Sequence, residues 1–154
     1  MRALVAFLSM LLCGCASVED LTRLSCIPTT AASDVWLKRE AYLYKIDGES
    51  EISLWSSPYR YGSGQDASGH LQIHTPPPLY TLGTGTRITI VRVTRETHFD
   101  NPPNVIRVRA VAHVGNVTVP FRYSWGIGNH INYAPWETDT YDPRDFSRAM
   151  ECKT

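Results

Sequence analysis

Charge is scarce in this chain and shows no excess of either sign. Lys and Arg number 15, Asp and Glu number 15, and charged residues make up only 19% of the 154 residues, below the usual quarter. A balanced chain has no net positive field to attract nucleic acid or anionic lipid, so neither is expected as an electrostatic partner. The length is that of one domain.

Long apolar runs are also missing beyond the N-terminus. Behind the single positive residue Arg2, an apolar stretch runs from Ala3 to Leu12, about half of the ~20 residues needed to cross a bilayer. Such a stretch is typical of a secretory signal peptide, and a buried N-terminal helix is the alternative. No second run of this kind follows, so we expect no transmembrane helix in the mature chain.

Cysteine is rare, and two of the four cysteines directly follow the apolar stretch. The segment Leu12-Cys13-Gly14-Cys15 resembles the lipobox of bacterial lipoproteins, in which an aliphatic and two small residues precede an acylated cysteine. The resemblance implies cleavage before Cys15, acylation of Cys15 with chains such as palmitate, and loss of Cys13 with the signal. Ordinary secretion, with cleavage after the triplet Gly14-Cys15-Ala16, is the alternative. Because Ala16 is not Asp, the resemblance also implies transfer to the outer membrane, facing the periplasm or the cell surface.

The anchor divides the chain into three parts. We expect a signal peptide over 1–14, a lipid anchor with a tether and leading segment over 15–39, and a β domain with a C-terminal helix over 40–154. Acyl chains bind membranes by about 0.8 kcal/mol per buried methylene, so the anchor needs no help from charge. The stretch between Cys15 and Cys26 could reach ~35 Å if extended, which would let the domain stand off the membrane.

Strands and turns dominate the expected secondary structure. Ten Pro, ten Gly and eight Tyr favour them over helices. The β-branched stretch Thr86–Glu96 changes phase, which indicates a bulge near Ile90–Val91 or a strand covered on both faces. The stretch Asn104–Tyr123 alternates around a Gly115-Asn116 turn and reads as a hairpin.

The expected fold is mainly β, a small antiparallel barrel or sandwich with a short C-terminal helix. The stretch from Pro78 to Tyr123, in which Gly83-Thr84-Gly85-Thr86 leads into a long bent strand, resembles small SH3-like barrels of bacterial lipoproteins. Asp142 as a helix cap, Pro143 at the first helical position and an apolar face at Phe146, Ala149 and Met150 predict the helix.

Two cysteines remain after the signal and the anchor are set aside. Cys26 and Cys152 lie near the two ends of a domain expected outside the cytoplasm, which predicts a disulfide. Two separate buried thiols are the alternative. In the entropic description, a bridge over so long a loop stabilises by roughly 5 kcal/mol.

Signatures of catalysis and metal binding are missing. The chain has no H-E-x-x-H, no paired-cysteine spacing and no G-x-S-x-G. Its histidines show no ligand spacing, so we expect no metal and no cofactor; they are His70, His74, His98, His113 and His130. The carboxylates Asp139, Asp142 and Asp145 favour a cap and a solvated face over an acid/base pair.

Aromatic residues are dense near the C-terminus. Trp125, Tyr133 and Trp136 flank a Gly/Asn/His loop, where rings can stack on sugars or anchor a protein partner. The alternative is that they cover the open end of a barrel. The sequence therefore predicts a non-catalytic envelope module that binds a protein or peptidoglycan through this surface.

Two other functions stay open. One is an envelope hydrolase that uses carboxylates. The other is a lysozyme inhibitor, since Ser57-Pro58-Tyr59-Arg60-Tyr61 resembles a motif of one inhibitor family. The flanking residues depart from that family's pattern, so no residue role is carried over.

Overall fold

The computed structural model describes residues 17–27, 33–65, 71–97, 104–140 and 148–150. They form strands and no helix, so the described part holds no helix able to span a membrane. The strands are β1 (Ser17–Asp20), β2 (Asp34–Trp36), β3 (Ala41–Lys45), β4 (Ile52–Trp55), β5 (Tyr61–Gln65), β6 (Leu71–His74), β7 (Tyr80–Leu82), β8 (Arg87–Thr97), β9 (Val105–Val114), β10 (Val117–Ile127), β11 (His130–Ile131) and β12 (Arg148–Ala149).

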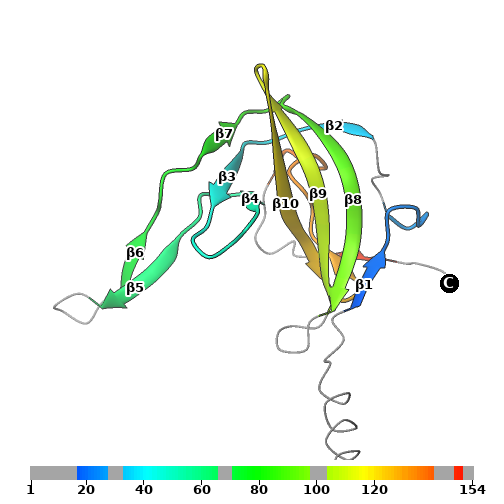
Figure 1. The fold of residues 1–154 in the computed structure, drawn as a ribbon, viewed down its shortest axis with the longest axis horizontal. Helices are drawn as coiled ribbons and strands as arrows, with labels where there is room; N and C mark the ends of the chain where they lie inside the picture. The colour runs from blue at the N-terminus through cyan, green and yellow to red at the C-terminus, as the bar shows by residue number, and fades with distance from the viewer. Residues whose placement is uncertain (1–16, 28–32, 66–70, 98–103, 141–147, 151–154) are drawn as a thin grey trace, which may run out of the picture.

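The prediction of a mainly β fold is confirmed, but the sheet is open. Its strands follow the order β1-β8-β9-β10-β4-β3-β7, with β2 on β8 and with β11 and β12 continuing from β10. Since β1 and β7 at the two ends of this path are not paired with each other, the sheet does not close, and the barrel, one of the two predicted forms, is wrong. Strands β5 and β6 form a separate two-stranded arm that projects from the main sheet (Figure 1).

The β9–β10 hairpin has the predicted register. Ala112 pairs with Val119 and Ala110 with Phe121, so small residues face large ones in the core. Gly115 turns the chain with φ of 57°, a backbone conformation that glycine adopts without steric cost.

The predicted bulge in β8 is also present. The register of β8 on β9 shifts between Ile90 and Arg92, and the unpaired Val91 is 55% exposed. The bulge therefore explains why Ile88 and Ile90 are buried together with Val93 although their spacing breaks strict alternation.

The core is one cluster shared by both parts of the sheet. Leu43 and Leu54 of the β3–β4 hairpin are buried in the same cluster as Val108, Phe121 and Trp125. The backbone connection between the two parts is slight, because β4 meets β10 through one parallel pairing. Side-chain packing therefore holds the β3–β4 hairpin against β10.

The predicted C-terminal helix is not formed by its described residues. Arg148 and Ala149 form β12 and pair with β11, and the Met150 N–H donates to the Asn129 carbonyl over 2.7 Å. An isolated short helix is marginal in water, so these tertiary hydrogen bonds outweigh the weak helical pattern. Residues 142–147 and 151 of that prediction lie outside the described residues.

The segment expected to be a tether belongs to the sheet from Ser17 onward. Strand β1 pairs along the end of β8, and β2 pairs along its beginning. Leu21, Ile27 and Leu37 are buried. The boundary expected at residue 39 is therefore not a boundary of the fold, and the β domain includes the described residues from 17 onward.

Cys26 is partly buried and packs against the core. The other cysteines of the chain, Cys13, Cys15 and Cys152, lie outside the described residues. The pairing of Cys26 with Cys152 therefore stays a prediction.

Candidate functional site

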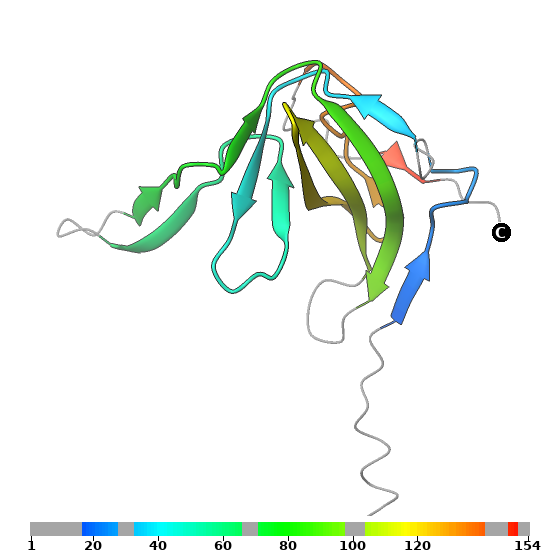
Figure 2. The ribbon, with the colours of Figure 1, turned by 45° about the horizontal axis from the view of Figure 1, so that its top comes forward.

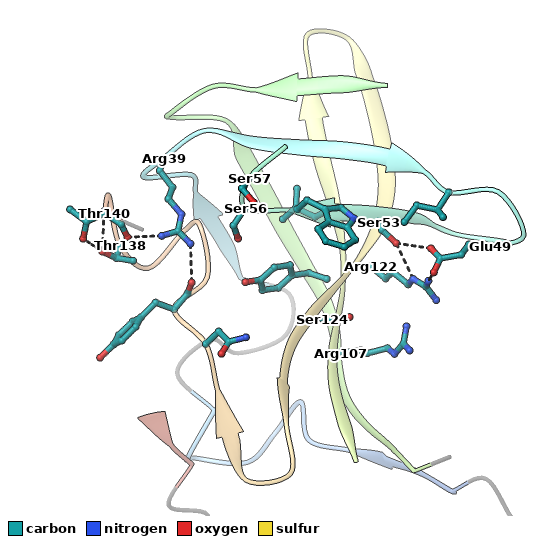
Figure 3. Close-up of a pocket in the computed structure, with 16 residues that line it drawn as sticks. Arg39, Glu49, Ser53, Ser56, Ser57, Arg107, Arg122, Ser124, Thr138 and Thr140 are labelled. Atoms are coloured by element: carbon teal, nitrogen blue, oxygen red, sulfur yellow. Dashed lines mark hydrogen bonds and ion pairs between the residues drawn. The ribbon is translucent and has the colours of Figure 1, made fainter. Parts of the chain in front are cut away.

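A cavity of about 480 Å³ lies where β4 and β10 separate (Figure 3). The two strands meet where Ser53 pairs with Arg122, and residues beyond this pairing on each strand line the cavity together with residues from 132–140. The lining is rich in hydrogen-bonding groups. Besides the phenol groups of Tyr123 and Tyr133, the lining has six aliphatic hydroxyl groups, which belong to Ser53, Ser56, Ser57, Ser124, Thr138 and Thr140.

One side of the cavity carries a fixed polar cluster. Arg122 Nε donates to Ser53 Oγ over 3.1 Å, and Ser53 Oγ donates to Glu49 Oε2 over 3.0 Å. The Arg122 guanidinium also forms an ion pair with Glu49. The turn that places Glu49 follows β3, with Gly48 at φ of 83°. Glu49 thus contacts both Ser53 and Arg122 and fixes the guanidinium at this wall of the cavity.

A second guanidinium lies next to this cluster on the neighbouring strand. Arg107 lines the cavity from β9, opposite Ser124 of β10. Its Nε forms an ion pair with Glu96 over 2.8 Å, and its side chain is 19% exposed. No described residue makes a hydrogen bond to its two terminal nitrogens, so these N–H groups are available to a ligand in the cavity.

The third guanidinium, that of Arg39, has a structural role. It lies across the cavity from the Glu49 cluster (Figure 3) and donates to the carbonyls of Thr140 over 2.6 Å and Tyr133 over 3.0 Å. These bonds fasten the segment 132–140 to the chain just before β3. The cavity lining therefore contains three guanidinium groups and one carboxylate, and its charge is positive.

Aromatic rings continue from the cavity wall onto the β5–β6 arm. Trp55 lines the cavity, and its ring centroid is 4.5 Å from that of Tyr59. Tyr59 stacks on Tyr61 at 5.9 Å, and Tyr61 stacks on His74 of the arm at 5.5 Å. The Tyr59 N–H donates to the Tyr44 hydroxyl over 3.2 Å. We call Trp55, Tyr59, Tyr61 and His74 the aromatic strip.

The aromatic residues singled out from the sequence are divided between core and surface. Trp125 is fully buried and Trp136 is 5% exposed, and their rings lie 6.3 Å apart. The indole N–H of Trp125 donates to the Asn132 carbonyl over 2.8 Å. Only Tyr133 is on the surface, 37% exposed and covered by Arg148 at 4.9 Å. The two indoles therefore cannot present an exposed binding surface, and their burial favours the alternative of a covering role.

The other polar candidates stay apart. His74 lies on β6, His130 on β11, and His113 on β9, where it hydrogen bonds with Arg87 and Thr89. Asp139 lines a second, more open hollow beside Trp136 and not the 480 Å³ cavity. Within the described part of the chain, no three His, Cys, Asp or Glu side chains are grouped to hold a metal. His70, His98, Asp142 and Asp145 lie outside the described residues.

Comparison with known proteins gives no relative: no family profile, no curated protein and no solved structure matches this chain.

Sequence reasoning missed the cavity because its parts are remote in the chain. Arg122 and Ser53 are 69 positions apart, and Arg107 lies on a third strand, β9. A weak local signal was present, because three aromatic residues fall within seven positions, namely Trp55, Tyr59 and Tyr61.

Proposed function

We propose that this chain is a lipid-anchored cell-envelope protein, acylated at Cys15 and sited at the outer membrane, whose β domain binds peptidoglycan without cleaving it. The observation that carries the ligand class is the cavity between β4 and β10, with its three guanidinium groups and its row of hydroxyls. Peptidoglycan offers matching chemistry, since its sugars carry hydroxyl and amide groups and its lactyl and peptide parts carry carboxylates.

The terminal nitrogens of Arg107 suit a carboxylate of the ligand. Charge-assisted hydrogen bonds to a carboxylate are among the strongest that a polar cavity makes. The guanidinium is oriented by Glu96, so little side-chain freedom is lost when a ligand binds. The serine and threonine hydroxyls of the lining can then form hydrogen bonds with the sugar hydroxyls.

The aromatic strip suits the less polar faces of sugar rings. Tyr61 is 44% exposed and lies next to His74 on the arm, so a glycan bound at the cavity can extend along the strip. Aromatic side chains supply contact area with little loss of conformational freedom. A positively charged cavity that continues into the aromatic strip supports the proposal that the ligand is a saccharide with carboxylate groups.

A hydrolase that uses carboxylates receives less support. Acid/base cleavage of a glycosidic bond needs two carboxyl groups on either side of the bond. Among the described residues the cavity has one, Glu49, and it is bound to both Arg122 and Ser53. Both oxygens of Glu49 are engaged within the protein, one by Arg122 and the other by Ser53.

Binding is tested by sedimentation of purified sacculi with the full chain in detergent. We expect the protein to sediment with the sacculi and to release no soluble glycan fragments. Failure to sediment, together with inhibition of a purified lysozyme, would instead indicate a protein partner. Release of reducing ends would contradict a non-catalytic role.

Anchoring is tested by labelling with radioactive fatty acid. We expect label in the native chain and in the C13S variant but not in the C15S variant, which should accumulate as uncleaved precursor. Label in the C15S variant would contradict the anchor. Mass mapping without reduction should link Cys26 to Cys152, and free thiols at both would contradict that bridge.

A further inference from the structure

We infer that the end of the sheet formed by the start of β1, the end of β8, the start of β9 and the end of β10 lies directly on the lipid surface, without an intervening tether. This inference rests on the proposed acylation of Cys15. It goes beyond that proposal because it assigns which end of the domain meets the membrane.

The length of chain between the anchor and the sheet carries the argument. Strand β1 begins at Ser17, which pairs with Thr97 at the end of β8. Two residue steps separate Ser17 from Cys15, and two steps span at most ~7 Å even when extended. An acylated Cys15 must lie at the lipid headgroups, so Ser17 and its neighbours in the sheet must lie close to them as well.

The residues beside Ser17 define this end, which we call the membrane-facing end. Val105 at the start of β9 pairs with Glu96 of β8 on one side and with Ile127 of β10 on the other. In both views of the ribbon β1 begins at the end of the sheet opposite the β9–β10 turn (Figures 1 and 2). That turn is the length of β9 away, or about 30 Å.

The surface chemistry of this end fits a lipid interface held by acyl chains. Two apolar side chains are exposed here, Val18 at 59% and Ile127 at 54%. The nearby charges are paired within the protein, Glu19 with Arg95 at 2.7 Å and Glu96 with Arg107 at 2.8 Å. With its described charges paired, this end has no excess positive charge for anionic lipid, so its position should not depend on lipid charge.

The test uses fluorescent probes on the full acylated protein in phosphatidylcholine vesicles that contain a headgroup spin-labelled lipid. One probe is attached at I127C in the membrane-facing end. The matched control is attached at V117C, which replaces an equally exposed apolar residue, 52% exposed, beside the distant β9–β10 turn. We expect quenching of the first probe and little quenching of the second, with the same result in vesicles that contain phosphatidylglycerol.

A tether variant completes the experiment. A flexible Gly–Ser insertion of about 12 residues between Ala16 and Ser17 has an average span of about 20 Å and should abolish most of the quenching at residue 127. Equal quenching at both probes, or no quenching at residue 127 in protein that mass spectrometry shows to be acylated, would overturn the inference and leave the anchor intact. Protein that lacks acyl groups overturns the anchor itself, and the inference with it.

Discussion

Ser53 of β4 and Arg122 of β10 are joined twice, once by the parallel pairing of their backbones and once by the Arg122 Nε to Ser53 Oγ hydrogen bond of 3.1 Å. The same Arg122 is ion-paired with Glu49. This point therefore both attaches the β3–β4 hairpin to the large sheet and fixes one wall of the candidate site. Because Ser53 and Glu49 hold the Arg122 side chain in place before a ligand binds, a substitution of a residue that lines the cavity is expected to change ligand binding.

Arg107 is predicted to carry a large share of the affinity for sacculi. The R107Q variant loses charge-assisted hydrogen bonds worth about 1.5–3 kcal/mol, which corresponds to roughly 10–100-fold weaker binding. The measurement is a binding isotherm on purified sacculi. The R109Q variant is the matched control, because Arg109 is on the same strand and pairs with Glu51 over 3.4 Å outside the cavity. Equal losses in both variants would contradict a specific role.

Tyr61 is predicted to add affinity through the aromatic strip. The Y61A variant removes a ring that stacks on both Tyr59 and His74, and a ring contact of this kind contributes about 0.5–1.5 kcal/mol. Binding should therefore weaken by roughly 2–12-fold, as measured by the same isotherm. The I73A variant, which removes a 62% exposed apolar side chain from the same arm, should bind as the native protein does. A similar loss in I73A would indicate that the arm acts by apolar contact in general.

The sequence predicted those parts of the fold that depend on neighbouring residues. Alternation and a Gly-Asn turn determine the β9–β10 register, and the phase change in Thr86–Glu96 marks the bulge at Val91. The parallel contact of Ser53 with Arg122 has no local signature, since it depends on packing of the β3–β4 hairpin against a strand 69 positions away. The predicted helix failed for the same reason, because Arg148 and Ala149 are held by β11.

The sequence predicted the type of residue at the candidate site, namely aromatic rings, but not which aromatic residues form it. Aromatic rings were expected at a binding surface, but the polar loop beside Trp125 and Trp136 suggested exposure where the fold buries both rings. Burial depends on which segments return to cover a side chain. The rings that do reach the surface, Tyr59 and Tyr61, lie on the segment that leads into the arm.

Trp136 is predicted to act in stability. Its ring is 5% exposed and lies 5.3 Å from that of Tyr123, so the W136A variant leaves a cavity and should lose about 3–5 kcal/mol of unfolding free energy. Urea unfolding of the purified protein measures this loss. The W36A variant, in which the replaced ring is 56% exposed, should change stability by about 0.5 kcal/mol or less. A native-like stability of W136A would contradict its place in the core.

Gly126 is predicted to tolerate no side chain. A Cβ at this position would lie 1.9 Å from the carbonyl oxygen of His130 and 2.7 Å from the Ile131 Cα, and both are backbone atoms that β11 holds in place. The G126A variant should therefore lose at least about 1–3 kcal/mol of stability, measured by thermal unfolding. The G83A variant, where a Cβ meets no atom within 4 Å, is the control. A stable G126A would mean that β10 and β11 are not in contact at this point.

Asp20 is predicted to make the stability of the fold depend on acid pH. Hydrogen bonds from Thr22, with a smaller contribution from Arg92, lower the pKa of this carboxyl from 3.8 to about 2. The Thr22 N–H donates to Asp20 Oδ1 over 3.0 Å and Arg92 Nε donates to Oδ2 over 2.8 Å, which links the end of β1 to β8. A group whose pKa is lower in the folded state stabilises above its unfolded pKa, and this contribution is lost as the pH falls through its folded pKa.

The contribution of Asp20 should therefore be complete above about pH 4 and should be lost between about pH 4 and pH 2. The measurement is urea unfolding of the native and D20N proteins across this range. The difference between their unfolding free energies should shrink as the pH falls, because protonation removes from the native protein the charge that D20N already lacks. The T22V variant keeps the carboxylate but loses the Thr22 hydroxyl, whose hydrogen bond is the largest cause of the lowered Asp20 pKa, so its acid-dependent loss of stability should be smaller and should end at a higher pH than that of the native protein. A difference between native and D20N that stays constant from pH 5 to about pH 2 would show that the carboxylate charge does not hold β1 on the sheet.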